Sequence, residues 1–262
     1  MSDCTFRDYI DIFHRRDYFR SDDLIRIEQA ERSWLSNARR VLFTSKWAAE
    51  RATQYYALDA NRVTSVGIFG EIDLPLHDTY ADGKEFAFVA TNFEAKGGRT
   101  VLGAFRELQE RHADATLIVV GEKPSDLEPE RGVNFVGFLR KEIPEEYARY
   151  KGILGSVRAI VHPTRSDIAP LVVIESGYLG CPTISSRSFA IPELIDHART
   201  GFLLDDPSDV TALAGAMNWM LEHGDEYRQM RRATWDKTRQ QHSKKQFEER
   251  LLTFLNQDLP WA

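Results

Sequence analysis

Short apolar strands alternate with helical segments over most of this 262-residue chain, and this alternation constrains the fold more than any other feature. One strand, residues 117–120, reads Leu-Ile-Val-Val and is continuously apolar, as a strand covered on both faces must be. Alternating β and α elements of this length predict an α/β fold with a parallel, doubly wound sheet and right-handed crossovers. From residue 86 onward we expect strands at 86–91, 116–121, 134–138, 159–162, 183–186 and 201–204, with helices at 100–112, 144–155, 171–179, 208–223, 226–241 and 243–255.

The first part of the chain predicts a separate and smaller α/β segment. Apolar residues at helical spacing indicate a helix over residues 22–38, with Ser21 or Asp22 as its cap. A strand at 40–44, a helix capped by Ser45 and a strand at 62–68 then complete one βαβ unit.

Residues 71–84 contain Pro75, Asp78 and Gly83 and show little periodicity, so we expect an exposed connection between domains. The predicted organisation is a partial amino-terminal α/β domain over residues 1–75 and a complete Rossmann-like domain over residues 76–242. The last helix, in residues 243–262, is expected to pack back towards the first domain.

Composition excludes some classes of function. A hydrophobic content of 42% and a net charge of -6 describe a soluble globular protein and argue against binding of nucleic acid through phosphate contacts. Cys4 and Cys181 have no spacing typical of a disulfide framework or a zinc site, which favours a reducing, cytoplasmic setting. No apolar run is long enough to span a bilayer, so we expect membrane contact to be peripheral at most.

Two acids, Asp167 and Glu175, stand at the junction between the strand at 159–162 and the helix that begins near Leu171. Both carboxylates are therefore expected at the carboxyl edge of the parallel sheet, where open α/β folds bind ligands. The neighbours of Glu175 are apolar, so the start of this helix should be buried, and a buried acid needs a partner.

Several segments in a fixed order resemble the retaining glycosyltransferases of family 4, which have the GT-B architecture of two facing Rossmann-like domains. The segments are the Asp167–Glu175 acid pair, Lys96-Gly97 after a strand, residues 133–139, Gly180-Cys181-Pro182, Ile191-Pro192-Glu193 and Thr200-Gly201-Phe202-Leu203. The sequence departs from the family pattern at three places. Asp167 replaces Glu, Ala169-Pro170 replaces Phe-Gly, and Ala90-Thr91 replaces Gly-Arg.

The resemblance implies a set of donor-binding residues. Lys96 and Gly97 would contact the diphosphate together with the amides around Ala169, Leu171 and Val172, because a helix amino terminus and a cation both neutralise phosphate charge. Phe138 would lie in the loop beneath the nucleotide base. Arg99 and Arg165 are near enough in the expected fold to replace part of the missing arginine, whereas Pro170 supplies no donor.

The resemblance implies different roles for the two acids. Glu175 would bind the ribose hydroxyls, and Asp167 would be the catalytic carboxylate that contacts the donor sugar near the reacting carbon. The alternatives are a salt-bridged helix-surface Glu175, an ordinary loop acid at Asp167 and a solvated turn lysine at Lys96. Asp is shorter than Glu by one methylene, about 1.5 Å, and a displacement of this size affects catalysis by positioning.

The amino-terminal segment resembles only the middle and later parts of the acceptor-binding domain, so the chain is expected to be an amino-terminally truncated member of the family. His14, His77 and His162 match no family motif, and none is assigned as a catalytic base. A partial sheet leaves an unpaired edge, which favours a homodimer or a complementing partner chain.

The expected function is transfer of a sugar from a nucleotide-diphosphate sugar to a glycan or small-molecule acceptor, with retention of anomeric configuration. We predict no metal site, since no Asp-x-Asp motif follows a strand, and no cofactor besides the nucleotide-sugar substrate. One alternative is a catalytically impaired sugar-nucleotide-binding or scaffold subunit that needs a partner chain. A GT-B epimerase is a further alternative, although the spacing of Asp167 and Glu175 favours transfer over it.

Overall fold

The computed structural model describes residues 2–14, 16–78, 80 and 82–256, and their contacts divide them into two compact units. The larger unit runs from Gly70 to Gln241. The smaller unit is built from the residues described up to Phe69 and from His242 onward.

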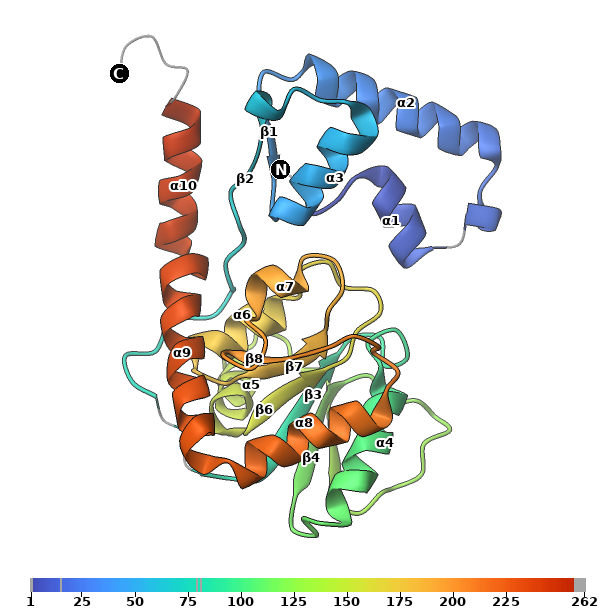
Figure 1. The fold of residues 1–262 in the computed structure, drawn as a ribbon. Helices are drawn as coiled ribbons and strands as arrows, with labels where there is room; N and C mark the ends of the chain where they lie inside the picture. The colour runs from blue at the N-terminus through green and yellow to red at the C-terminus, as the bar shows by residue number, and fades with distance from the viewer. Residues whose placement is uncertain (1, 15, 79, 81, 257–262) are drawn as a thin grey trace. The chain divides into compact units, whose positions relative to one another are not determined.

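The larger unit contains a six-stranded, fully parallel sheet with the strand order β5-β4-β3-β6-β7-β8 (Figure 1). Its strands are β3 (Glu85–Ala90), β4 (Thr116–Gly121), β5 (Val133–Gly137), β6 (Ala159–His162), β7 (Thr183–Ser186) and β8 (Gly201–Leu204). This confirms the predicted α/β fold with a parallel sheet. Strand order reverses between β3 and β6, so the sheet has its topological switch point there.

Helices cover the sheet because its strands are apolar towards both sides. They are α4 (Gly98–Gln109), α5 (Pro144–Ser156), α6 (Leu171–Tyr178), α7 (Ile191–Leu194), α8 (Val210–Glu222) and α9 (Gly224–His242). Helix α4 packs against α8, and α5 packs against α6 (Figure 1). One core cluster of this unit includes the fully buried side chains of Phe88 on β3, Phe105 on α4 and Leu117 on β4.

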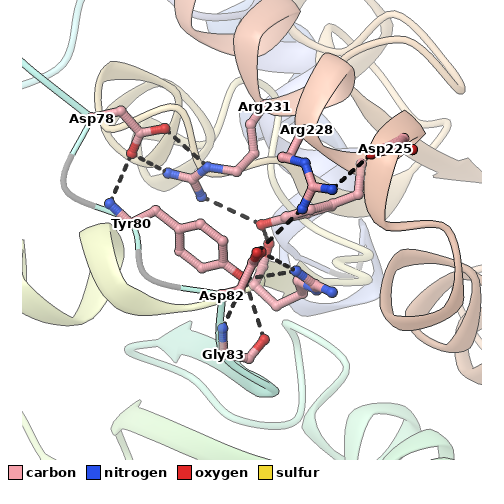
Figure 2. Close-up of polar contacts among 9 residues, drawn as sticks. Asp78, Tyr80, Asp82, Gly83, Asp225, Arg228 and Arg231 are labelled. Carbon is pink, nitrogen blue, oxygen red and sulfur yellow. Dashed lines mark hydrogen bonds and ion pairs between the residues drawn. The ribbon is translucent and has the colours of Figure 1, made fainter.

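The segment before β3 is tied to helix α9 by a buried arginine. Arg231 is 3% exposed and donates to both carboxylate oxygens of Asp78, at 2.6 and 3.1 Å, and to the carbonyl of Leu179 at 2.9 Å. Its guanidinium lies 4.0 Å from the ring centre of Tyr80, and the Tyr80 amide donates to Asp78 (Figure 2). The described residues of 71–84 form no helix or strand, as predicted, and most are exposed, although Ile72 is buried.

The smaller unit is organised around two short parallel strands, β1 (Val41–Phe43) and β2 (Val63–Ser65). Its helices are α1 (Phe6–Phe13), α2 (Ser21–Asn37), α3 (Lys46–Tyr56) and α10 (Lys244–Asn256), with 3-10 turns at Arg16–Tyr18 and Ala60–Arg62. As predicted, Ser45 caps α3 by accepting a hydrogen bond from the Ala48 amide at 3.1 Å. The predicted Ser21 or Asp22 cap is wrong, because α2 already begins at Ser21 and its N-cap is Arg20, which makes no side-chain capping bond.

Helix α10 belongs to this smaller unit. Arg250 Nε donates to the carbonyl of Val66 at 2.8 Å, and the rings of Phe247 and Phe69 have centroids 5.1 Å apart. Within the described parts of the chain, no helix has the length and apolar character needed to cross a membrane. Cys4 and Cys181 are both buried free thiols.

Candidate functional site

A cavity of about 470 Å³ opens at the carboxyl edge of the larger unit's sheet, between the loops that follow β3 and β6. This is the switch point, where open α/β sheets bind their ligands. Six of the predicted site residues line it: Lys96, Phe138, Asp167, Ala169, Leu171 and Val172. Thr91, Lys141, Tyr150 and His162 also contribute to its wall.

The loop after β3 holds Lys96 at one side of this cavity. Asn92 Oδ1 accepts a hydrogen bond from the Ala95 amide at 2.9 Å, which closes the turn before Lys96. Gly97 is the N-cap of α4 and has a φ of +84°, where a Cβ atom would stand 2.4 Å from the carbonyl oxygen of Pro163. Gly97 does not line the cavity; its lack of a side chain lets the loops after β3 and β6 approach each other.

Lys96 and Asp167 form an ion pair on the cavity wall. Lys96 Nζ lies 2.6 Å from Asp167 Oδ1 and also donates to the Ser166 carbonyl at 3.3 Å. Their side chains are 15% and 22% exposed, so the pair is only partly screened by water. Burial raises the pKa of Asp167, but the hydrogen bond from His162 and the charges of His162 and Lys96 outweigh it and hold this pKa below its usual range.

His162 is a site residue that the sequence did not single out. It ends β6, is 3% exposed and places Nε2 2.7 Å from Asp167 Oδ2. Its Nδ1 is buried and has no hydrogen-bond partner among the described residues. The available signal was its position at the end of a buried strand, directly before the loop that carries Asp167.

Glu175 is fully buried in α6 and does not line the cavity. Its Oε1 accepts hydrogen bonds from Lys141 Nζ at 2.6 Å and the Glu71 amide at 3.0 Å, and its Oε2 accepts one from the Tyr150 hydroxyl at 2.8 Å. The prediction that a buried acid here needs a partner is confirmed. The sequence reasoning missed Lys141 and Tyr150, although Lys141 follows β5 at the same edge of the sheet.

The first turn of α6 presents its amino terminus to the cavity. Pro170 is the N-cap, and the following Leu171 and Val172 line the cavity wall. The first amides of a helix have no partner within the helix and carry partial positive charge, so this end favours an anion. The same cavity is thus lined by the amino terminus of α6 and by the side chains of Lys96 and Lys141.

The two arginines expected to compensate for the missing family arginine lie elsewhere. Arg99 is half exposed and pairs with Glu94 and Asp126 at 2.8 and 2.7 Å, and Arg165 donates to the Ser208 hydroxyl. Neither lines the cavity. Among the described residues, no group of three or more His, Cys, Asp or Glu side chains is arranged to hold a metal ion.

Residues 75–236 match the family model of glycosyl transferases group 1. The chain belongs to this family. A D-inositol 3-phosphate glycosyltransferase of Corynebacterium jeikeium is 30% identical to this group 1 chain over 141 residues, which cover 48% of the chain and 33% of the relative.

Solved structures share the fold of this group 1 chain. A mutant of S. aureus TarM in complex with Fondaparinux, alpha-GlcNAc-glycerol and UDP matches with a TM-score of 0.72 and 12% identity over 88% of this chain and 46% of TarM. Anabaena Alr3699/HepE in complex with UDP has a TM-score of 0.72 and 17% identity over 94% of this chain and 70% of that protein. This group 1 chain therefore has a GT-B-type fold, and it spans less than half the length of TarM and 33% of the Corynebacterium relative.

Proposed function

We propose that this chain binds a nucleotide-diphosphate sugar in the cavity at the switch point and transfers the sugar to an acceptor hydroxyl with retention of configuration, as a family 4 glycosyltransferase. The observation that carries the proposal is the meeting of Lys96, Asp167 and the amino terminus of α6 around a single cavity. TarM and Alr3699/HepE have both been solved with UDP, so a uridine diphosphate sugar is the first donor to consider.

In this proposal, different residues contact the diphosphate, the base, the ribose and the sugar of the donor. The diphosphate lies against Lys96 and the amides at Leu171 and Val172, where positive charge collects. The base lies near Phe138, whose side chain is 60% exposed beside the cavity, and the ribose lies towards the Glu175 end. With the diphosphate, base and ribose placed in this way, Asp167 lies close to the donor sugar.

The chemical step follows from this placement. The bond between the anomeric carbon and the diphosphate oxygen breaks as positive character develops on the carbon, and Lys96 with the helix amides stabilises the leaving diphosphate. The acceptor hydroxyl then attacks from the face that the diphosphate leaves and gives its proton to a departing diphosphate oxygen, which retains the configuration. To bind the phosphate oxygens, Lys96 must either break its ion pair with Asp167 or donate to the carboxylate and the phosphate at the same time.

A second candidate is a sugar-nucleotide-binding subunit with little turnover of its own. The Asp167 carboxylate favours it, because one oxygen is bonded to Lys96 and the other to His162. A carboxylate held on both oxygens is less available to a sugar hydroxyl than one that faces an open cavity.

Calorimetric titration of the protein with UDP and UDP-glucose tests binding. Release of UDP from UDP-glucose in the presence of a wide range of acceptors tests turnover. We expect Lys96→Met to weaken UDP binding and Lys84→Met to leave it unchanged. Lys84 is a matched control because it pairs with an acid, Asp114, but stands before β3 at the amino edge of the sheet. Absence of any nucleotide binding contradicts the donor-site proposal, whereas binding without UDP release favours the second candidate.

A further inference from the structure

The Asp167 carboxylate has a different partner on each of its oxygens. Lys96 Nζ, from the loop after β3, lies 2.6 Å from Oδ1, and His162 Nε2, at the end of β6, lies 2.7 Å from Oδ2. The Asp167 side chain is 22% exposed, so water replaces a lost partner only in part. The free energy of the ionised carboxylate therefore depends on both contacts.

The two partners differ in their freedom to move. His162 is 3% exposed, its carbonyl accepts a hydrogen bond from the Ser185 hydroxyl at 2.8 Å, and its ring centre lies 6.4 Å from that of the buried Phe88. Lys96 stands in a loop and carries its ammonium on a flexible stem of four carbons. A ligand in the cavity can therefore draw Lys96 away from Asp167, whereas His162 stays in place.

The ring of His162 is arranged to donate to Asp167. An ionised carboxylate can only accept, so the hydrogen of this bond is on Nε2. The other ring nitrogen, Nδ1, is buried and has no hydrogen-bond partner among the described residues. The bond to Asp167 is thus the polar contact that fixes the orientation of the ring and of the carboxylate.

A phosphate group at Lys96 changes the surroundings of Asp167. When the ammonium turns to a phosphate oxygen, Oδ1 of Asp167 loses its partner, and a largely buried carboxylate without partners is unfavourable. With His162 in place, the carboxylate keeps one charge-assisted hydrogen bond. Without that bond, Lys96 would be harder to remove from Asp167, and a phosphate would bind less tightly.

We propose that His162 is a positioning residue of the donor site, which holds Oδ2 of Asp167 so that Lys96 can leave Oδ1 for a phosphate group of the nucleotide. This inference rests on the proposed donor site and adds to it a residue that acts through Asp167. It predicts that the effect of His162 on nucleotide binding depends on the charge at position 167.

A double-mutant cycle measured by calorimetric titration with UDP tests this dependence. His162→Leu should weaken UDP binding about tenfold, the effect of one hydrogen bond to a charged group. Asp167→Asn removes the charge that competes for Lys96 and should strengthen UDP binding. In that background, His162→Leu should change the affinity little, so the two substitutions are not additive. An equal loss in both backgrounds means that His162 contacts UDP itself or only supports the fold, and overturns the proposal.

Two polar substitutions of His162 separate the hydrogen bond from the shape of the side chain. The amide nitrogen of Gln can occupy the place of Nε2, whereas that of Asn falls near the place of Nδ1. His162→Gln should therefore keep the UDP affinity of the wild type, and His162→Asn should lose it as His162→Leu does. Equal affinities of the Gln and Asn variants for UDP contradict the proposal, and this pair decides the question if His162→Leu does not fold.

His112→Leu is the matched control. His112 also bonds through Nε2 to a side-chain oxygen, Oδ1 of Asn218 at 2.9 Å, but it does not line the cavity. Its replacement should leave UDP binding unchanged. A wild type that binds no UDP contradicts the donor site and the inference together, whereas UDP binding without coupling between positions 162 and 167 overturns the inference alone.

Discussion

Replacing Asp78 by Asn should lower the stability of the larger unit by about 2 kcal/mol. The loss of one partner of a buried ion pair costs roughly 3–5 kcal/mol when both groups are buried. Arg231 is 3% exposed, but Asp78 is 42% exposed, and water therefore screens part of the lost attraction. Arg231 also keeps its bond to the Leu179 carbonyl, which further reduces the cost.

A loss of this size should appear as a lower melting temperature. For a unit of this length, about 2 kcal/mol corresponds to a decrease of roughly 4–8 °C. Circular dichroism can follow the transition, and saturating UDP identifies it as that of the larger unit if UDP binds there. Asp225→Asn is the control, because Asp225 is 85% exposed and pairs with the 57% exposed Arg228, so we expect no measurable shift. Equal melting temperatures for the two variants would refute the reasoning, and an Asp78→Asn/Arg231→Met variant should recover part of the loss.

Three further predictions concern residues that line the cavity or lie in the loop beside it. Lys96→Ala should weaken UDP binding at least tenfold and leave the affinity for uridine nearly unchanged in calorimetry, because in the proposed complex the lysine contacts the diphosphate and not the nucleoside. Gly97→Ala should destabilise the larger unit by about 1–3 kcal/mol in thermal unfolding, since φ is +84° and the new methyl group meets the Pro163 carbonyl. The pKa of Asp167 is lower in the folded protein than the roughly 3.9 of an unfolded Asp. The contribution of Asp167 to the free energy of unfolding is therefore complete above its pKa in the unfolded state and is lost as the pH falls towards its pKa in the folded state. Asp167→Asn should therefore make the free energy of unfolding depend less on pH under acidic conditions.

The sheet could be predicted from the sequence because each of its strands is a short apolar run between helical segments. Strands β4, β6, β7 and β8 begin and end where the sequence predicted. The strand expected at 62–68 in the smaller unit is shorter, because β1 offers only the three residues Val41–Phe43 as partners. The cap of α2 was missed because Arg20, which has no capping side chain, precedes the helix.

The site was predictable as far as backbone topology determines it. Lys96 and Asp167 follow neighbouring strands, so their loops meet at the switch point whatever the side-chain conformations are. Lys141 and Tyr150 come from the loop after β5 and from α5, and their contacts with Glu175 depend on rotamers that a sequence does not encode locally. His162 was passed over because it matched no motif, although it stands at the end of a buried strand.

One oxygen atom of Glu175 connects the cavity wall to the path of the main chain. Oε1 accepts from Lys141 and also from the backbone amide of Glu71, and the preceding Gly70 amide donates to the Tyr178 hydroxyl on the same helix α6. Gly70 is the first residue of the larger unit. We therefore expect a ligand that shifts Lys141 to alter the hydrogen bond between this shared acceptor and the Glu71 amide, and amide hydrogen exchange at Glu71 should change when the cavity is occupied.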